Sequence, residues 1–247
     1  MMFAPHPDDE SLACGILLQS AVQAGAAISI VYVTDGENNP WPQRYLSRRW
    51  RLNPANLHKW AKLRRKEALA ALCILGAAPA DAQFLGWPDQ GLARLLISDC
   101  ASSVARLRHF IIEWSPTHVV APDVADRHRD HSAVGAMIGL LFSRSGTGLH
   151  QIQRWNYMVH GRDPRFLRNA FVVPQTRVQA ETKRRAISCH QTQLMLSRRR
   201  FISYAARPEL LLDIPTQGSA KESLDEALVR EQPGEAQVVA LHHGLDR

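Results

Sequence analysis

The chain has 247 residues, of which 45% are hydrophobic and 21% are charged, and it carries a formal net charge of +7 with a pI near 9.6. This composition is typical of a soluble globular protein that is large enough to bury a sizeable core. It argues against a membrane-spanning protein, because no run approaches the roughly 18 apolar residues that cross a bilayer. The N-terminus lacks the layout of a signal peptide, so we expect a cytoplasmic protein.

The positive charge raises the question of a nucleic acid or another anionic partner. Much of this charge lies in residues 44–51, 59–66 and 198–200. A nucleic-acid-binding surface would interleave aromatic residues with the basic ones, and only Trp50 and Trp60 come close to that pattern. We therefore expect solvated basic faces and no nucleic-acid partner. The four cysteines have no CxxC spacing, which argues against disulfides and a thiolate zinc site.

The first predicted elements alternate between strand and helix. Residues 1–4 are apolar but short for a strand, and residues 11–24 have apolar side chains at helical spacing before Gly25. Residues 27–33 form a nearly continuous apolar run, typical of a strand that is covered on both faces. Residues 34–57 are rich in Asn, Pro, Arg and Trp, and they predict a long irregular loop. Its position after a strand makes it a candidate wall of an active site.

The same alternation continues along the rest of the chain, where apolar spacing again distinguishes helices from strands. Glycine and proline residues punctuate the boundaries between these segments. The further expected elements are helices over 59–75, 98–114, 131–141 and 177–189, and strands over 82–85, 118–121, 152–159 and 170–173.

This order of elements predicts an α/β fold, a three-layer α/β/α sandwich around a mostly parallel, Rossmann-like sheet. Ligands of such sheets collect at the carboxyl ends of the strands. We expect residues 1–209 to form the domain. Residues 210–247 contain few apolar groups that could offset the entropy of ordering, so they predict a weakly ordered C-terminal tail.

Two clusters of histidine and aspartate each follow a predicted strand. The first is His6-Pro7-Asp8-Asp9-Glu10, and the second is His128-Arg129-Asp130-His131. A single His–Asp pair near a turn is most often a helix cap or a surface loop, because Asp favours helix starts. Two dense clusters in equivalent positions have instead the composition of a split metal site that activates water for hydrolysis.

A catalytic zinc ion typically has three protein ligands drawn from histidine and carboxylate side chains. His6 and Asp9, two residues apart in a tight turn, can face one ion, and His131 is the expected third ligand. Asp8 is expected to act as a general base, because neighbouring side chains seldom aim at the same atom. Iron or manganese also suits a site of mixed nitrogen and oxygen ligands.

The second cluster also supplies residues for supporting roles. His128 lies three residues before His131, so it is expected on the same side of a helix start, facing the substrate carbonyl as an oxyanion stabiliser or proton donor. Asp130 is expected to orient a ligand histidine, and Asp126 is a weaker candidate for that role.

The two clusters resemble the paired signatures of the LmbE-like/PIG-L family of zinc-dependent N-deacetylases, which remove acetyl groups from N-acetylglucosamine units. Thr34-Asp35-Gly36 after the second predicted strand also fits this family. Arg64 and Glu67 resemble its Arg-x-x-Glu helix, which closes on Leu-Gly at residues 75–76. The similarity extends over about residues 2–195.

The resemblance implies that zinc is bound by His6, Asp9 and His131, with Asp8 as the base and His128 facing the tetrahedral intermediate. These are the same assignments that follow from the chemistry of the residues.

The resemblance also implies that Arg64 binds near the substrate sugar or its anionic substituent. Lys183, His190 and Gln193 are similar to a later pattern of the family, in which Ser is usual at the position of Thr192. The first strand is shorter than the apolar lead-in of the relatives.

We therefore expect a metal-dependent hydrolase that removes the N-acetyl group from an N-acetylglucosamine-type amino sugar or glycoconjugate. An amidase for another acylated amine, such as a thiol-sugar conjugate or an acylated antibiotic, would use the same site. A non-catalytic module that binds an anionic ligand through its basic face is the alternative from a different class. The presence of stoichiometric metal distinguishes the enzymes from the module.

Overall fold

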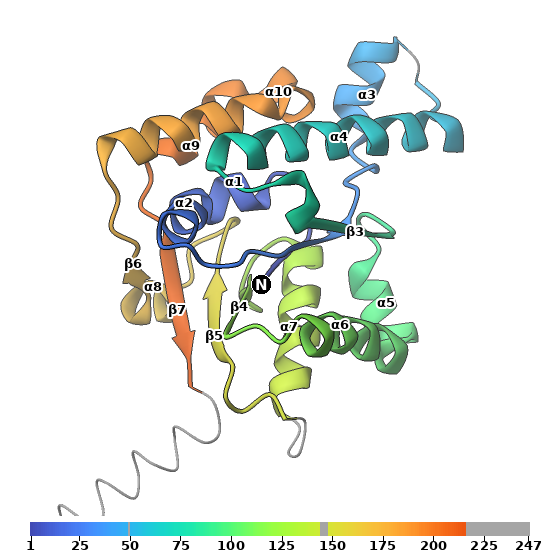
Figure 1. The fold of residues 1–247 in the computed structure, drawn as a ribbon. Helices are drawn as coiled ribbons and strands as arrows, with labels where there is room; N and C mark the ends of the chain where they lie inside the picture. The colour runs from blue at the N-terminus through green and yellow to red at the C-terminus, as the bar shows by residue number, and fades with distance from the viewer. Residues whose placement is uncertain (49, 144–147, 216–247) are drawn as a thin grey trace, which may run out of the picture.

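The computed structural model describes residues 1–48, 50–143 and 148–215 (Figure 1). Within these ranges the strands are β1 (Met2–Ala4), β2 (Ile30–Thr34), β3 (Ala82–Trp87), β4 (His118–Pro122), β5 (Gln153–Tyr157), β6 (Phe171–Val172) and β7 (Leu210–Ile214). The α-helices in the same ranges are α1 (Asp9–Ala13), α2 (Gly15–Gln23), α3 (Pro40–Ser47), α4 (Pro54–Leu75), α5 (Leu92–Ser98), α6 (Cys100–Trp114), α7 (Arg129–Ser143), α8 (Pro164–Asn169), α9 (Arg177–Cys189) and α10 (Gln191–Ser203).

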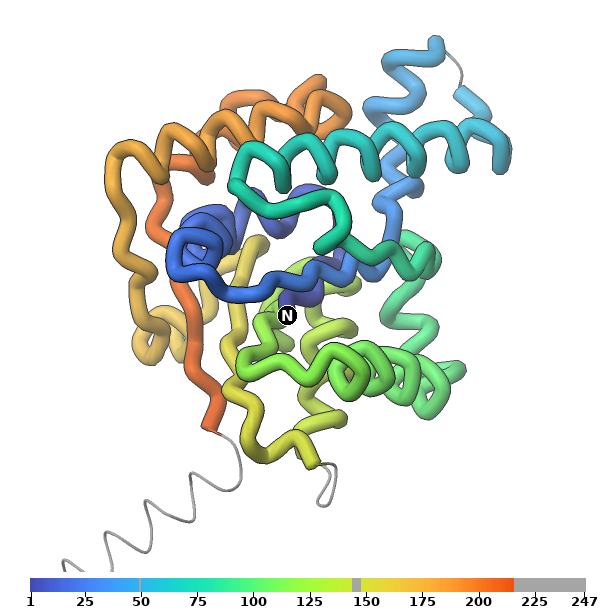
Figure 2. Tube along the Cα trace, viewed as in Figure 1, coloured from blue at the N-terminus to red at the C-terminus, as the bar shows by residue number. Residues whose placement is uncertain are grey.

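The strands form one sheet in the order β3-β2-β1-β4-β5-β7-β6. Neighbouring strands from β3 to β5 run parallel, whereas β7 runs antiparallel to both β5 and β6. Helices α1, α2, α4, α9 and α10 lie on one face of the sheet, and α5, α6 and α7 lie on the other (Figure 2). The predicted three-layer fold with a mostly parallel sheet is confirmed.

The two faces of β1 and β2 explain why these strands are apolar without interruption. Met2 and Tyr32 belong to the core beneath α2, α4 and α9, whereas Phe3 and Val31 belong to the core beneath α6 and α7. Successive side chains of a strand point to opposite faces, and here helices cover both of them. The sheet therefore holds the loops at its carboxyl edge on a rigid, fully buried support.

The prediction of one irregular loop over 34–57 is wrong. Pro40–Ser47 form α3, and α4 already begins at Pro54. Each helix has proline in its first turn, where the missing N–H costs nothing, although proline in a sequence also suggests a loop. Asn53 caps α4 through a hydrogen bond from the backbone nitrogen of Asn56 to its side chain at 2.9 Å.

The first residues of the predicted C-terminal tail form a strand of the sheet. Leu210–Ile214 form β7, in which Leu211 pairs with Tyr157 and Asp213 pairs with Trp155 of β5. A five-residue apolar segment carries too weak a pattern to be distinguished from a tail, and only pairing with β5 makes it a strand. The rest of the predicted tail, 216–247, lies outside the described residues.

Other differences concern where helices begin and end. The helix predicted over 11–24 is divided at Cys14 into α1 and α2, and the helices α5, α8 and α10 were not predicted. Their short or strongly basic sequences have no clear apolar period. None of the helices in the described ranges combines the length and the hydropathy that crossing a membrane requires.

Helix α7 approaches the loop after β4 so closely that position 135 has no room for a side chain. A Cβ atom on Gly135 would lie 2.6 Å from the carbonyl oxygen of Pro122 and 2.9 Å from the backbone nitrogen of Val124. We expect Gly135→Ala to lower the free energy of unfolding by about 1–3 kcal/mol, because the contacted atoms are backbone and α7 must shift. Urea denaturation followed by circular dichroism measures this change.

Gly139→Ala, one turn further along α7, is the matched control. Its Cβ atom would make only ordinary contacts with the Arg154 guanidinium group, the shortest at 3.7 Å. It is expected to raise the free energy of unfolding by roughly 0.5–1 kcal/mol through helix propensity. Equal losses of stability at the two positions would contradict the close approach at Gly135.

Candidate metal centre and active site

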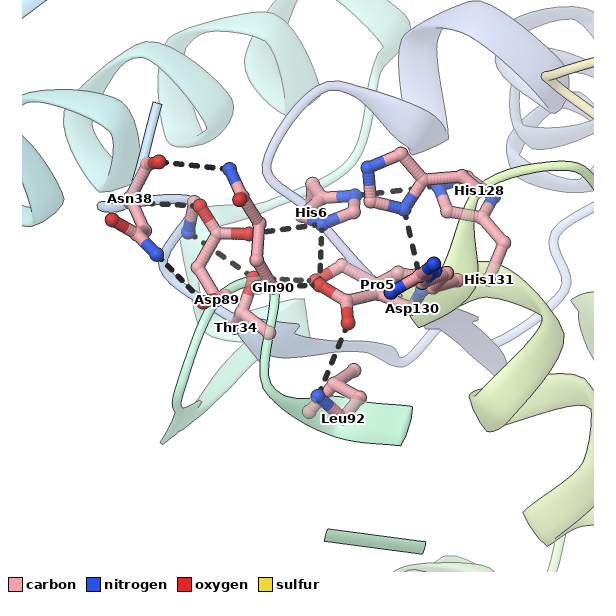
Figure 3. A network of polar contacts seen from close by, with 12 residues as sticks. Pro5, His6, Thr34, Asn38, Asp89, Gln90, Leu92, His128, Asp130 and His131 are labelled. Atoms are coloured by element: carbon pink, nitrogen blue, oxygen red, sulfur yellow. Dashed lines mark hydrogen bonds and ion pairs between the residues drawn. The ribbon is translucent and has the colours of Figure 1, made fainter. Parts of the chain in front are cut away.

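Three loops that leave the carboxyl ends of β1, β3 and β4 meet at one edge of the sheet. The loop after β1 carries His6, the turn after β3 carries Asp89, and the segment after β4 leads to His128 and His131 at the start of α7 (Figure 3). The two predicted clusters therefore lie together, although 125 positions separate His6 from His131. Asp89 joins them from a segment to which the sequence assigned no role.

The turn after β1 directs two side chains at the same point. Asp9 accepts a hydrogen bond from the backbone nitrogen of His6 at 2.8 Å through its Oδ2 atom. The backbone nitrogens of Asp8 and Asp9 lie 3.0 and 3.3 Å from the carbonyl oxygen of His6. These bonds hold the turn tightly enough for His6 and Asp9 to face one position, which agrees with their spacing in the sequence.

His6, Asp9 and His131 surround a common point with nitrogen and oxygen atoms. His6 Nδ1 lies 3.3 Å from His131 Nε2 and 3.6 Å from Asp9 Oδ2, and His131 Nε2 lies 3.3 Å from Asp9 Oδ1. Two ligand atoms at about 2.0–2.1 Å from a tetrahedral zinc ion are roughly 3.3–3.4 Å apart. The three side chains are therefore spaced as the ligands of one such ion.

The remaining ring nitrogen of each histidine faces a carboxylate. His6 Nε2 lies 3.2 Å from Asp130 Oδ2 and 3.2 Å from Asp89 Oδ1, and His131 Nδ1 lies 3.3 Å from Asp126 Oδ2. A histidine that binds metal usually donates its other N–H to a carboxylate, which fixes the ring and raises its basicity. Asp130 contacts His6 and Asp126 contacts His131, and their predicted orienting role remains a prediction.

The electrostatics of this cluster favour a bound cation. Burial by itself would lower the pKa of His131, but Asp9 and Asp126 outweigh it and raise the pKa to about 9. Burial likewise opposes the charged form of His6, yet its carboxylate partners raise the pKa of His6 well above its usual value. The two imidazoles keep the pKa of Asp9 well below its usual range, despite the burial that raises it. A divalent cation would replace the protons that the histidines otherwise take up.

Two wider sets of donor atoms surround the same point. In His6–His128–His131 and in His6–Asp89–Asp130, the donor atoms of each set lie within 4.8 Å of one another. His6 belongs to both sets, through a ring that presents Nδ1 to Asp9 and Nε2 to the two aspartates. His6, Asp9 and His131 combine two imidazole nitrogens with one carboxylate at separations of 3.3–3.6 Å, so these three are the candidate ligands, with the other residues around them.

Asp8 lines the same cavity as His6 and Asp9, and it is held by Arg64. The Arg64 guanidinium group donates to Asp8 Oδ2 at 3.0 Å, to the Pro7 carbonyl oxygen at 2.8 Å and to the Gly36 carbonyl oxygen at 2.9 Å. Burial raises the pKa of Asp8 to about 6, while Arg64 acts in the opposite direction. Asp8 is thus an ionisable carboxyl group, fixed in place beside the candidate ligands, with a pKa near the range useful for a general base.

His128 is held as a neutral hydrogen-bond donor. Its Nδ1 atom accepts a hydrogen bond from the backbone nitrogen of Asp130 at 3.3 Å, so the proton of the neutral ring lies on Nε2. Burial, followed by the positive charges of His6 and His131, lowers the pKa of His128. Its ring centroid lies 4.7 Å from that of His6. The Nε2–H group can therefore donate to an oxygen atom placed next to the metal ligands.

A cavity of about 460 Å³ opens above these residues. Its walls include Asn39, Trp41 and Pro42, so the segment predicted as an active-site wall does line the cavity, although it is partly helical. Arg64, the expected substrate-binding residue, also lines it. Lining residues beyond those already named include Leu12, Gln90, His160, Gln193, Leu196, Ser197, Arg200, Phe201 and Tyr204.

Several of these residues were not identified from the sequence. Asp89 follows β3 in a polar turn, a signal that the placement of the first two clusters could have suggested. His160 likewise follows β5, and its ring centroid lies 4.9 Å from that of His131. Burial and the nearby His131 lower the pKa of His160 to about 4. Arg200 of α10 and Tyr204, just beyond that helix, have no local signal in the sequence, because only packing brings them to the cavity.

Buried polar contacts connect the segment around His190 and Thr192, which resembles a later pattern of the family, to the residues beside the site. His190 Nε2 lies 3.1 Å from Glu10 Oε1, next to the metal ligands in sequence. Thr192 donates through its backbone nitrogen and its hydroxyl group to Glu67, at 2.9 and 2.5 Å. The threonine hydroxyl group therefore makes a contact that a serine could also make, so the departure from the family pattern leaves this junction intact.

Comparison with protein families gives one match over more than half of the chain. The PIG-L family model, described as GlcNAc-PI de-N-acetylase, matches residues 1–140. Among curated proteins, the 1D-myo-inositol 2-acetamido-2-deoxy-alpha-D-glucopyranoside deacetylase of Mycobacterium avium is 30% identical over 135 residues. That match covers 51% of this chain and 45% of the relative, so the chain spans about half the length of the curated relatives it matches.

Solved structures show the same fold at low sequence identity. The N,N'-diacetylchitobiose deacetylase of Pyrococcus horikoshii aligns with a TM-score of 0.64 and 19% identity, over 87% of this chain and 83% of that one. The 4-carboxy-2-hydroxymuconate hydratase of Pseudomonas putida KT2440 aligns with a TM-score of 0.57 and 17% identity, over 94% and 90%. A deacetylase and a hydratase thus share the fold. The fold therefore does not determine the reaction, which has to be inferred from the residues of the site.

Proposed function

Because the chain belongs to the PIG-L family, we propose that it is a metal-dependent hydrolase that removes the N-acetyl group from an N-acetylglucosamine-type amino sugar or glycoconjugate. The observation that carries the proposal is the spacing of 3.3–3.6 Å among His6, Asp9 and His131, each histidine being backed by a carboxylate. The curated relatives are named as deacetylases of an acetamido sugar, which supports the same chemistry.

The proposed metal is zinc, and the residues present fit it. Two imidazole nitrogens and one carboxylate oxygen form the neutral-nitrogen and anionic-oxygen donor set of catalytic zinc sites, which keep a further position for water or substrate. All three side chains are largely buried, while His6 and Asp9 also line the cavity through which water and substrate can reach the site. Zinc held there would supply a Lewis acid that acidifies water and polarises the acyl carbonyl group.

In the proposed reaction, residues of the chain transfer the protons and stabilise the negative charge that develops on the carbonyl oxygen. Asp8 takes a proton from the attacking water as the oxygen–carbon bond forms at the acetamide carbonyl carbon. The Nε2–H group of His128 donates a hydrogen bond to the oxygen that gains negative charge. When the carbon–nitrogen bond breaks, the proton on Asp8 is transferred to the departing nitrogen, so that acetate and the free amine are the products.

The direct test is the release of acetate from an N-acetylglucosaminide by purified protein that contains stoichiometric zinc. We expect turnover that disappears on chelation and returns on adding zinc. Full activity in metal-free protein would refute the metal dependence. Longer N-acyl glucosaminides and acetylated amines without a sugar form two further arms. They distinguish a sugar deacetylase from the alternative, an amidase for other acylated amines.

Arg64 is expected to act on catalysis by holding Asp8 in place. Arg64→Lys retains one charge, but an ammonium group cannot reach the three acceptors that the planar guanidinium group binds at once. We expect kcat/KM to fall about 10- to 100-fold, with zinc content unchanged. Steady-state kinetics together with metal analysis measures both quantities.

Arg65→Lys is the control for that substitution. Arg65 is the next residue of α4, but its guanidinium group pairs with Asp35 at 2.7 Å and its side chain is 39% exposed. We expect it to keep nearly full activity. If both variants behave alike, the Arg64–Asp8 contact has no special part in catalysis.

A further inference from the structure

Four arginines line a second pocket that is continuous with the metal cavity. This pocket, of about 490 Å³, shares His160, Arg200 and Tyr204 with the cavity above the metal ligands. Its remaining lining residues are Arg127, Val159, Gly161, Arg162 and Arg207. Among the described residues no acidic side chain lines it, so four guanidinium groups face one space without a counter-charge from that part of the chain.

These arginines have no ion-pair partners within the part of the chain that the structure describes. Arg127, Arg162 and Arg200 make no side-chain hydrogen bond there, and Arg207 donates only to the hydroxyl oxygen of Ser203 at 2.9 Å. Acidic residues adjacent in sequence face elsewhere. Asp126 accepts hydrogen bonds from the backbone nitrogens of residues 159 and 160, and it also contacts His131. The side chain of Asp163 caps the first turn of α8.

The pocket is held in shape by contacts other than ion pairs. The hydroxyl group of Tyr204 donates to the Val159 carbonyl oxygen at 3.0 Å, and the Arg207 guanidinium group lies 4.1 Å from the centre of the Tyr204 ring. Gly161 has a φ of 105°, and a Cβ atom there would lie 2.9 Å from Arg127 Cγ. The absence of a side chain at residue 161 thus lets Arg127 lie across the loop after β5.

Like charges gathered in one pocket repel one another, and a bound anion relieves this repulsion. Guanidinium groups bind the oxygens of phosphate and carboxylate through pairs of parallel N–H donors. We propose that Arg127, Arg162, Arg200 and Arg207 form a subsite for an anionic group, phosphate or carboxylate, on the part of the substrate that adjoins the acetylated sugar. This inference rests on the proposed function and narrows its substrate class to anionic glycosides.

Three substrates that differ only in the group at the anomeric position test the subsite. They are methyl N-acetylglucosaminide, its carboxymethyl counterpart and N-acetylglucosamine 1-phosphate. For the zinc-loaded protein we expect kcat/KM for one or both anionic compounds to exceed that of the neutral compound by at least about tenfold, mainly through KM. The more favoured anion identifies the group. Equal or better use of the neutral compound would overturn the proposal.

Two double variants distinguish specific binding of an anion in the pocket from long-range attraction by positive charge. Arg162→Gln with Arg207→Gln is expected to reduce the anionic-to-neutral ratio of kcat/KM by about tenfold or more. Arg165→Gln with Arg168→Gln removes the same charge from exposed positions of α8 that do not line the pocket, and it should leave the ratio unchanged. Equal losses in both double variants would show long-range attraction only, and the subsite would be rejected.

Binding measurements test the anionic subsite independently of the proposed deacetylase activity. If none of the three compounds is hydrolysed, the proposed function fails, and calorimetric titration of N-acetylglucosamine 1-phosphate against N-acetylglucosamine still reports on the arginines. A preference for the phosphate that is lost in the Arg162/Arg207 variant supports the subsite. Equal affinities for the two compounds would overturn it whatever the enzyme does.

Discussion

The Asp8→Asn protein is expected to bind zinc like the unsubstituted protein and to lose about 10²- to 10⁴-fold of its kcat. The amide retains an oxygen that can accept the Arg64 hydrogen bond, so the turn and the guanidinium group stay in place. It cannot take up a proton from the attacking water, and this is the step that the proposal assigns to Asp8. Stopped assays of acetate release and metal analysis of the same preparation measure the two quantities.

The matched control for this loss is Asp99→Asn, the same chemical change at an exposed residue between α5 and α6. It should alter neither zinc content nor kcat. Full activity in the Asp8→Asn protein would refute the base assignment and leave the metal site untouched. Loss of zinc in that protein would show instead that Asp8 contributes to holding the ion.

His131→Ala is expected to empty the metal site and to abolish deacetylation. The substitution removes one of three ligands and leaves the buried carboxylates of Asp9 and Asp126 without their shared imidazole. Zinc affinity should fall by more than the roughly 10- to 100-fold that follows the loss of a residue that only orients a ligand. Equilibrium dialysis against a zinc buffer measures the affinity.

His109→Ala controls for the loss of an imidazole group as such. The side chain of His109 is 62% exposed on α6, where it pairs with Glu113, far in sequence from either cluster. Its removal should leave the zinc affinity as it was. Stoichiometric zinc in the His131→Ala protein would exclude His131 as a ligand and favour the His6–Asp89–Asp130 set of donor atoms.

The repeating pattern of apolar residues was sufficient to predict the central architecture. The sequence predicts strands over 27–33 and 118–121, and they correspond to β2 and β4 on either side of β1. The helix over 177–189 coincides with α9 at both ends. These segments are long or strongly apolar, and the burial that stabilises them acts through spacings within the segment itself.

The segments that were predicted incorrectly are those whose residues are compatible with two different conformations. Pro40 and Pro54 occupy first turns of helices, but proline and asparagine in a sequence equally suggest a loop. Leu210–Ile214 is too short to display a period, and it becomes a strand because β5 offers an unpaired edge. In both cases the neighbouring structure, and not the segment alone, selects the conformation.

The sequence by itself determined the fold class and the candidate metal ligands, because alternation of elements and the order of donors in a tight turn are encoded within a few residues. Tertiary structure alone decided what surrounds those ligands. Asp89 and His160 arrive on other loops, and the four arginines come from the segment before α7, the loop after β5, the end of α10 and the segment that follows α10. Residues so distant in the chain become neighbours only when the buried sheet brings the ends of its strands to one edge. No pattern within a short segment of the sequence indicates which of these loops will meet.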